Sequence, residues 1–317
     1  MIVTVTMNPA VDQTLVLQKF VAGDTLRVKS SRSDPGGKGI NVSRVVRELG
    51  GESIAMGFAP GGLGHYIERE LEKAGIETDF VQTEGETRTN IAILDEARHG
   101  TTILSAPGPN TNPEAVEELR ARLRSRLQAG DWLVLAGSIP PPLSSHCYNE
   151  IIQEASDAGV HTVLDADQDP LAEGAAAHPE IVKGNRRELE RLVGRPLDDE
   201  ESTLGAACEV HESGVPTVLV TRGRHGAIAV SRGSIWRGIA PRVRAVSAVG
   251  SGDAFVAGVV LKLSRGSPMQ DALRLGIAAG TAAVLTPGTE LCHRREVDIL
   301  YPRVRVEPIA DAVSARN

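Results

Sequence analysis

Short apolar runs rich in β-branched residues recur along the chain and alternate with segments whose apolar residues follow a helical period. In the segment 114–128, for example, Val116, Leu119 and Leu123 fall on one helical face. Such alternation predicts an α/β fold with a mostly parallel sheet covered by helices on both faces. The predicted strands are residues 2–7, 53–59, 132–136, 160–164, 181–183 and 217–221, with an antiparallel pair at 227–230 and 234–237.

Two early regions do not follow this rhythm. Residues 14–20 and 25–31 read as short strands with one polar face, and residues 89–95 and 101–105 read as a hairpin across Arg98-His99-Gly100. These strands predict a separate small sheet. No repeat or low-complexity linker divides the chain, so one domain over 1–317 is expected, with a lid formed by roughly 12–33 and 86–105. Helices are predicted at 40–49, 65–74, 114–128, 253–264 and 269–285.

Composition narrows the class of protein. The chain has 317 residues, a net charge of −7 and only 3% aromatic residues, which argues against nucleic acid as a partner. Its three cysteines are widely spaced and predict no disulfide framework. The start lacks the basic region of a signal peptide, and the apolar stretch around 276–286 is too short to span a membrane. We therefore expect a cytoplasmic protein.

A glycine-rich segment, Gly250-Ser251-Gly252-Asp253, precedes an apolar helical run. A helix start with little side-chain bulk presents backbone N–H groups at the positive end of the helix dipole, where phosphate or a developing oxyanion binds. Asp253 in the first turn is suited to take a proton from an attacking hydroxyl group. The alternative is an ordinary glycine-rich turn in which Asp253 only complements the helix dipole.

A second glycine-rich helix start is Gly36-Gly37-Lys38-Gly39-Ile40-Asn41. A sugar or phosphate can lie directly against such a backbone, with the Lys38 ammonium and the Asn41 amide as hydrogen-bond donors. The alternative is tight packing of the helix against a strand.

Further along the chain, Asn185-Arg186-Arg187-Glu188 has the spacing of a helix capping box. The same oxygens are compatible with holding a water-bound Mg²⁺. The turn from Thr221 to Gly226 lies at a strand end, and its glycines leave room for a nucleotide. The motifs of P-loop NTPases, dinucleotide-binding dehydrogenases and HExxH metalloproteases are all absent. The missing dinucleotide-binding motif argues against a nucleotide-cofactor oxidoreductase.

In this order, the motifs resemble the PfkB family of sugar kinases, which has the ribokinase-like fold. The resemblance runs from Thr6-Met7-Asn8-Pro9-Ala10-Val11-Asp12 to residues 276–283, and its most specific parts are Gly36–Val42 and Val249–Asp253. Thr87-Arg88-Thr89-Asn90 and Val182–Leu189 resemble the branch of phosphofructokinases and tagatose-6-phosphate kinases. The fold implied is a three-layer sandwich with a mostly parallel central sheet and a small β-sheet lid.

The resemblance implies transfer of the ATP γ-phosphoryl group to a phosphorylated ketohexose, with Mg²⁺ and with Asp253 as general base. The Gly250, Ser251, Gly252 and Asp253 amides would form the anion hole, and the lid would pair with that of a second subunit to give a homodimer. Residues implied in sugar-phosphate binding are Asp12, Arg27, Gly37, Lys38, Asn41, Arg88 and Ser138; those on the ATP side are Lys183, Asn185, Thr221, Gly223, Gly226 and Val249, with Asn185 and Glu188 at the metal.

Departures from the family pattern include Gly184, where proline is common, and the basic Arg222 and Arg224 in the nucleotide loop. None removes an implied catalytic group. The acceptor stays open: fructose 1-phosphate or fructose 6-phosphate, giving fructose 1,6-bisphosphate, or tagatose 6-phosphate. A catalytically silent sugar-phosphate-binding protein on the same fold is a further alternative.

Overall fold

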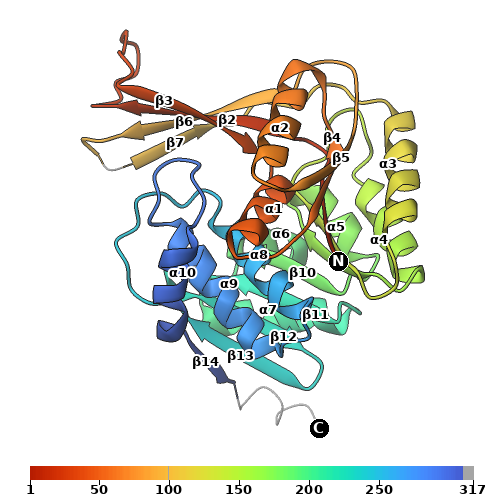
Figure 1. The fold of residues 1–317 in the computed structure, drawn as a ribbon. Helices are drawn as coiled ribbons and strands as arrows, with labels where there is room; N and C mark the ends of the chain where they lie inside the picture. Colours follow the sequence, from red (N-terminus) through yellow and green to blue (C-terminus); the bar gives the residue numbers. More distant parts are fainter. Residues whose placement is uncertain (99, 310–317) are drawn as a thin grey trace.

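A ten-stranded sheet forms the centre of the molecule in a computed structural model that describes residues 1–98 and 100–309. Seven neighbouring strands, from β11 to β5, are parallel, and three antiparallel strands complete one edge (Figure 1). Every residue of β1, β4 and β8 is buried, as expected for strands covered on both faces. The strand order is β14 (Arg305–Pro308), β13 (Ser234–Ile239), β12 (Ala227–Ser231), β11 (Thr217–Thr221), β10 (Ile181–Asn185), β9 (His161–Asp165), β8 (Trp132–Ala136), β1 (Ile2–Thr6), β4 (Ile54–Phe58) and β5 (Glu77–Val81).

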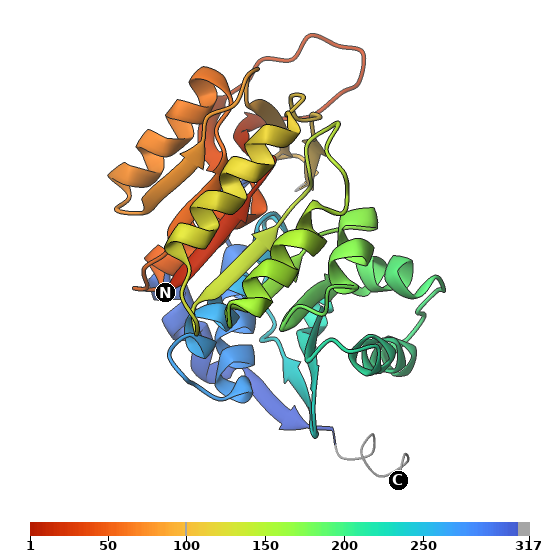
Figure 2. The same cartoon turned by 90° about the vertical axis from the view of Figure 1, so that its right-hand side faces the viewer.

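Helices cover both faces of this sheet, which confirms the predicted three-layer α/β sandwich. Alternate residues of β8 enter two separate apolar cores, since Leu133 and Leu135 pack on one side and Val134 on the other. Figure 2 shows α3 and α4 side by side over the first face. That face carries α3 (Pro113–Arg126), α4 (Cys147–Asp157), α5 (Gln168–Ala175), α6 (Arg186–Val193) and α7 (Glu200–Glu212); the other carries α1 (Lys38–Glu48), α2 (Gly61–Lys73), α8 (Ser251–Leu263), α9 (Met269–Ala283) and α10 (Arg294–Leu300).

The early strands form a second sheet that projects from the main body (Figure 1). The chain enters it directly from β1 through Met7-Asn8-Pro9. The predicted hairpin of residues 89–95 and 101–105 is confirmed as an antiparallel pair, although His99 of its turn lies outside the described residues. The strand order of this sheet is β3 (Ser30–Gly36), β2 (Ala10–Leu17), β6 (Arg88–Asp95) and β7 (Gly100–Leu104).

Three predicted segments had wrong boundaries. The strand expected at 14–20 begins at Ala10 and ends at Leu17, because it pairs with β6 along its whole length. The strand expected at 25–31 begins at Ser30 and continues to Gly36, because Asp34 pairs with Asp12 across the sheet. Helix α2 begins at Gly61, four residues before the predicted start. The prediction missed this first turn because its three glycines do not favour a helix on their own. Across residues 1–98 and 100–309, none of the helices is both long and apolar enough to cross a membrane.

Candidate active site

The carboxyl ends of the parallel strands line one edge of the large sheet, and a cleft lies between this edge and the second sheet. In open α/β sheets this edge is where ligands bind. The cleft has a volume of about 580 Å³, within the range of small-molecule sites. Eight residues predicted for the site line it: Asp12, Gly37, Lys38, Asn41, Arg88, Ser138, Val249 and Asp253.

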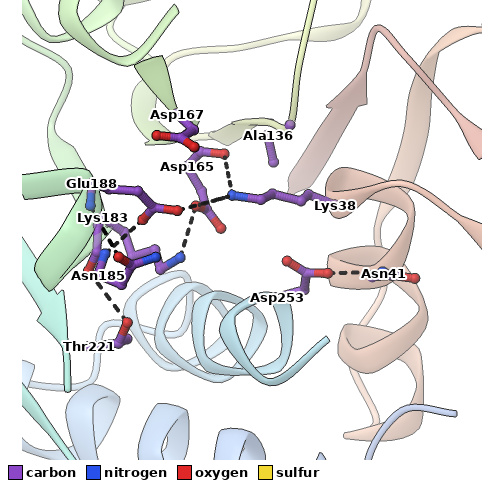
Figure 3. A network of polar contacts seen from close by, with 12 residues as sticks. Lys38, Asn41, Ala136, Asp165, Asp167, Lys183, Asn185, Glu188, Thr221 and Asp253 are labelled. Carbon is purple, nitrogen blue, oxygen red and sulfur yellow. Dashed lines mark hydrogen bonds and ion pairs between the residues drawn. The ribbon is translucent and has the colours of Figure 1, made fainter. Parts of the chain in front are cut away.

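The two glycine-rich helix starts, those of α1 and α8, meet at this cleft. Asn41, in the first turn of α1, donates a hydrogen bond of 2.9 Å from Nδ2 to Oδ2 of Asp253 in the first turn of α8 (Figure 3). Gly37 has a φ of 113°, and a β-carbon at Gly39 would lie 2.6 Å from the Val5 carbonyl oxygen. These glycines therefore allow the helix to pack tightly against the strand, and the same motif also lies at the cleft. The two alternatives given for the motif do not exclude each other.

Asp253 is 7% exposed and combines a buried carboxylate with an opening onto the cleft. Burial, reinforced by the negative charge of Asp165, raises the pKa of Asp253 to about 6; Lys38 and the hydrogen bond from Asn41 oppose this rise. A carboxylate with such a pKa is a stronger base than an exposed one and is still ionised at neutral pH. The geometry fits proton abstraction from a hydroxyl group in the cleft.

A second buried carboxylate, Asp165 at the end of β9, joins two lysines. Its Oδ1 accepts hydrogen bonds of 2.9 Å from Nζ of Lys38 and of 2.9 Å from Nζ of Lys183 (Figure 3). Although burial alone would raise the pKa of Asp165, the Lys183 and Lys38 ammonium groups hold it below its ordinary value. The Lys38 ammonium also lies 3.9 Å from Glu188. Lys38 therefore reaches from the sugar-binding side predicted for it toward the side predicted for the nucleotide.

Polar side chains of the second sheet close the opposite wall of the cleft. Asn90 Nδ2 donates a 2.8 Å hydrogen bond to Oδ1 of Asp12, and a β-carbon at Gly36 would lie 2.3 Å from that carboxylate. Glycine at position 36 thus makes room for Asp12. Burial raises the pKa of Asp12, against the lowering effects of Asn90 and Arg88.

Arg88 is anchored by the backbone. Its guanidinium donates to the carbonyl oxygens of Pro9 (3.4 Å), Asn8 (3.0 Å) and Ala106 (2.8 Å), from Nε, Nη2 and Nη1 respectively. Three of the five N–H groups of an arginine are used in this way. Among residues 1–98 and 100–309 the other two have no hydrogen-bond acceptor, so the anchored guanidinium is preorganised to meet an anion in the cleft.

The predicted capping box at the start of α6 is confirmed. Asn185 Oδ1 accepts from the backbone N–H groups of Arg187 and Glu188, and Glu188 Oε2 accepts from the N–H of Asn185. These contacts leave Oε1 of Glu188 outside the cap. Across residues 1–98 and 100–309, no three His, Cys, Asp or Glu side chains gather into a set that could hold a metal ion.

Several predicted residues do not line the cleft itself. Arg27 lies exposed in the connection between β2 and β3, and its predicted contact with the sugar phosphate stays a prediction. Close packing alone explains the glycine at position 226, since a β-carbon there would lie 2.1 Å from the Gly238 carbonyl oxygen. Arg222 pairs with Glu200 on α7. The other predicted residues outside the cleft lining are Gly250, Ser251, Gly252, Lys183, Asn185, Glu188, Thr221 and Gly223.

Sequence reasoning did not identify the roles of Asp165, Asn90 and Thr289. Asn90 and Thr289 line the cleft. Thr289 Oγ1 donates a 3.2 Å hydrogen bond to Asp34 Oδ2 and lies 3.1 Å from Thr14 Oγ1. These two contacts join the loop that contains Thr289 to the second sheet. The available signal for Asp165 was its place directly after a predicted strand, next to the strand that carries Lys183.

Comparison with known proteins agrees with this geometry. The chain is 34% identical over 310 residues to a 1-phosphofructokinase of Borreliella burgdorferi, with 98% of this chain and 99% of the relative covered. It is 32% identical over 309 residues to a tagatose-6-phosphate kinase of Staphylococcus epidermidis, with 96% and 99% covered. These relatives match the whole length of the fold, including the second sheet.

Solved structures give the same grouping. The fold superimposes on phosphofructokinase-2 from Escherichia coli, solved in complex with substrates and products, with a TM-score of 0.91, 30% identity and 95% and 98% of the two chains covered. A ribokinase from Arabidopsis thaliana shares the fold with a TM-score of 0.74 at 22% identity, over 95% of this chain and 98% of the other, which establishes the ribokinase-like architecture. The model of the pfkB family of carbohydrate kinases matches residues 5–295, and the chain belongs to this family of sugar-phosphorylating enzymes.

Proposed function

We propose that this enzyme transfers the γ-phosphoryl group of ATP to the free hydroxyl group of a phosphorylated ketohexose. Fructose 1-phosphate and fructose 6-phosphate are the leading acceptors, and both give fructose 1,6-bisphosphate. The observation that carries the proposal is Asp253, a buried carboxylate in the first turn of α8 that opens onto the same cleft as Asp12, Asn41 and Arg88.

In the proposed reaction, Asp12 and Asn41 orient the sugar hydroxyl groups and Arg88 binds the phosphate already on the sugar. Asp253 accepts the hydroxyl proton as the oxygen forms a bond to the γ-phosphorus. The bond from that phosphorus to the bridging oxygen breaks, and ADP leaves with the electron pair. The first amides of α8, at Gly250 to Asp253, receive the negative charge of the transferring group, because a helix start has N–H groups without intrahelical acceptors.

The nucleotide side is assigned to the ends of β10 and β11 and to the start of α6. Val249, Thr221, Gly223 and Gly226 are proposed to border the nucleotide, with Lys183 and Asn185 near its phosphates. Mg²⁺ needs only one or two protein carboxylates when phosphates and water supply its other ligands, and the uncapped Oε1 of Glu188 fits that requirement. We assign Glu188 and Asn185 to this ion, which would neutralise charge on the phosphates when bound.

An ADP-release assay with fructose 1-phosphate, fructose 6-phosphate and tagatose 6-phosphate tests this function. Turnover with one of the fructose phosphates is expected. Turnover with tagatose 6-phosphate alone would assign the enzyme to that acceptor. Binding of sugar phosphate without turnover of any of the three would replace the kinase by a silent binding protein.

Replacement of Arg88 by alanine is expected to raise KM for the sugar phosphate about 10- to 100-fold, the worth of one or two charge-assisted hydrogen bonds, and to change KM for ATP much less. Steady-state kinetics with each substrate varied in turn measure the difference. Arg47→Ala is the matched control, because Arg47 also donates to a backbone carbonyl but lies exposed on α1. Equal increases in both KM values for Arg88→Ala would remove the phosphate-binding assignment.

We also propose that the second sheet acts as a lid and pairs with the lid of a second copy. Leu104 on β7 is 52% exposed, and Val21 and Val28 in the β2–β3 connection are 40% and 45% exposed. Ile103, the neighbour of Leu104, lines the cleft instead, because successive side chains of a strand point to opposite faces. Exposed apolar side chains on and beside a small sheet are typical of an interaction surface.

Sedimentation analysis is expected to give a dimer for the natural protein and a monomer for Leu104→Arg, since a charge on the lid would be buried without a partner. Ile299→Arg on α10, where the isoleucine is 54% exposed, is the control and is expected to stay dimeric. A natural protein that sediments as a monomer at micromolar concentration would refute the lid-to-lid pairing.

A further inference from the structure

Asp165 is a fully buried carboxylate at the edge of the cleft, and the reaction scheme above gives it no role. It is 0% exposed, and within the described residues its Oδ2 has no hydrogen-bond partner. Both of its ion pairs therefore converge on Oδ1, from Lys38 on one side and Lys183 on the other (Figure 3). Burying a charge is costly unless partners compensate it, so this arrangement needs an explanation beyond packing.

The two lysines come from elements that are distant in sequence. Lys38 is the first residue of α1, and Lys183 lies on β10, where it is 4% exposed. A β-carbon at Gly252 would lie 3.2 Å from Nζ of Lys183, so this ammonium sits directly beneath the glycine-rich start of α8. Asp253 projects from the same helix start toward the space beside Lys38 (Figure 3).

We propose that Asp165 is a positioning residue that holds the Lys38 and Lys183 ammonium groups together opposite Asp253, where they receive the phosphoryl group in transfer. This inference rests on the proposed kinase function. Asp165 neutralises only one of the two ammonium groups, and Glu188, 3.9 Å from Lys38, is assigned above to the metal ion, so the lysines keep positive charge that attracts a phosphoryl group. Fixed in advance, the ammonium groups stabilise its charge without moving during the reaction.

Asp165 also keeps Lys38 away from Asp253. The charged groups facing Asp253 are Asp165 on β9, Lys38 on α1 and Lys183 on β10, with Asn41 as its hydrogen-bond donor. Without the Asp165 carboxylate, the lysines have Asp253 as the remaining nearby acid, together with Glu188 for Lys38. An ion pair with Asp253 would make that residue a weaker base.

Asp165→Asn tests the proposal because it keeps the size of the side chain and removes its charge. We expect kcat to fall about 10- to 100-fold, the cost of misplacing groups at a reacting centre, while KM for each substrate changes less. The acidic limb of the pH profile of kcat/KM is expected to move to lower pH, because Asp253 loses a negative neighbour. A residue needed only for folding would lower stability and leave kcat of the folded protein unchanged at pH values where Asp253 is ionised.

Asp131→Asn is the matched control. Asp131 forms a 2.7 Å ion pair with the N-terminal amino group at the opposite edge of the same sheet, and its side chain is 13% exposed. This variant is expected to lose stability but to keep the kcat and the pH profile of the natural enzyme. Unchanged kcat in folded Asp165→Asn above pH 7 would overturn the proposal, whereas inactivity of the natural enzyme would refute the kinase function itself.

A second pair of variants removes the dependence on Asp165→Asn being folded. Lys183→Met leaves Asp165 paired with Lys38, and Lys183→Met/Asp165→Asn removes one charge of each sign from the interior. If Asp165 positions Lys38, the added substitution lowers kcat a further tenfold or more. If Asp165 only neutralises Lys183, the double variant has the same kcat as Lys183→Met, and the proposal is wrong.

Discussion

Asp253→Asn is expected to lower kcat by about 10²- to 10⁴-fold, the usual contribution of a positioned general base. The asparagine has the same shape, and its side-chain oxygen can accept the hydrogen bond that Asn41 donates to Asp253. Sugar-phosphate binding should therefore change little, because the loss concerns the proton transfer and not the ground-state contacts. Steady-state kcat and equilibrium binding of the sugar phosphate, measured on the same preparation, separate the two effects.

The fold of this variant should not suffer. Raising a carboxyl pKa from 3.8 to about 6 means that keeping Asp253 ionised costs the folded state roughly 3 kcal/mol at neutral pH. This cost appears as the pH rises through the folded-state pKa and is absent below the unfolded-state value, so Asp253→Asn should equal or exceed the natural protein in thermal stability at pH 8. Asp271→Asn, at the exposed start of α9, is the matched control with unchanged kcat. A kcat close to the natural value in Asp253→Asn would end the assignment of the base.

The pH dependence of the natural enzyme should follow the same carboxylate. With a pKa of about 6, Asp253 is ionised and able to accept a proton above pH 7, and it becomes protonated as the pH falls. The rate kcat/KM is then expected to be level above pH 7 and to decrease about tenfold for each pH unit well below 6. Initial rates between pH 4.5 and 8.5 at constant ionic strength measure this limb.

Circular dichroism across the same range provides the control, since a loss of folded protein at low pH would also reduce the rate. A rate that stays level down to pH 5 in folded protein would show that proton transfer to Asp253 does not limit the reaction. The residual rate of Asp253→Asn should lack the limb altogether, which links the two predictions to one group.

Much of the fold was predictable because its signals are local. The buried strands β8 to β11 were predicted from short apolar runs, and the start of α6 from the spacing of Asn185 and Glu188. The glycine-rich helix starts were recognisable because glycine marks a backbone conformation or a close contact within a few residues. That Asn41 and Asp253 belong to one site was an expectation that rested on family resemblance, since no local pattern joins positions so far apart; the hydrogen bond between them was not predicted.

What could not be predicted depends on which groups meet across the sheet. Asp165 acquires its surroundings from Lys38 and Lys183, and neither lies near it in the sequence. Arg88 reads as a free guanidinium in the sequence, whereas three backbone carbonyl groups hold it in place. Burial and partner, which set the chemistry of both residues, are properties of the assembled sheet.

The order of strands in the large sheet has a consequence for synthesis of the protein. β1 is synthesised before the other strands of this sheet, yet one of its two neighbours is β8, which ends at Ala136. The helix that carries the proposed base follows more than a hundred residues later and packs against α1 near the N-terminus. The growing chain must therefore keep its earliest segments available until α8 has emerged, and an incomplete chain that stops before Asp253 contains most of the residues that line the cleft but lacks its reactive group.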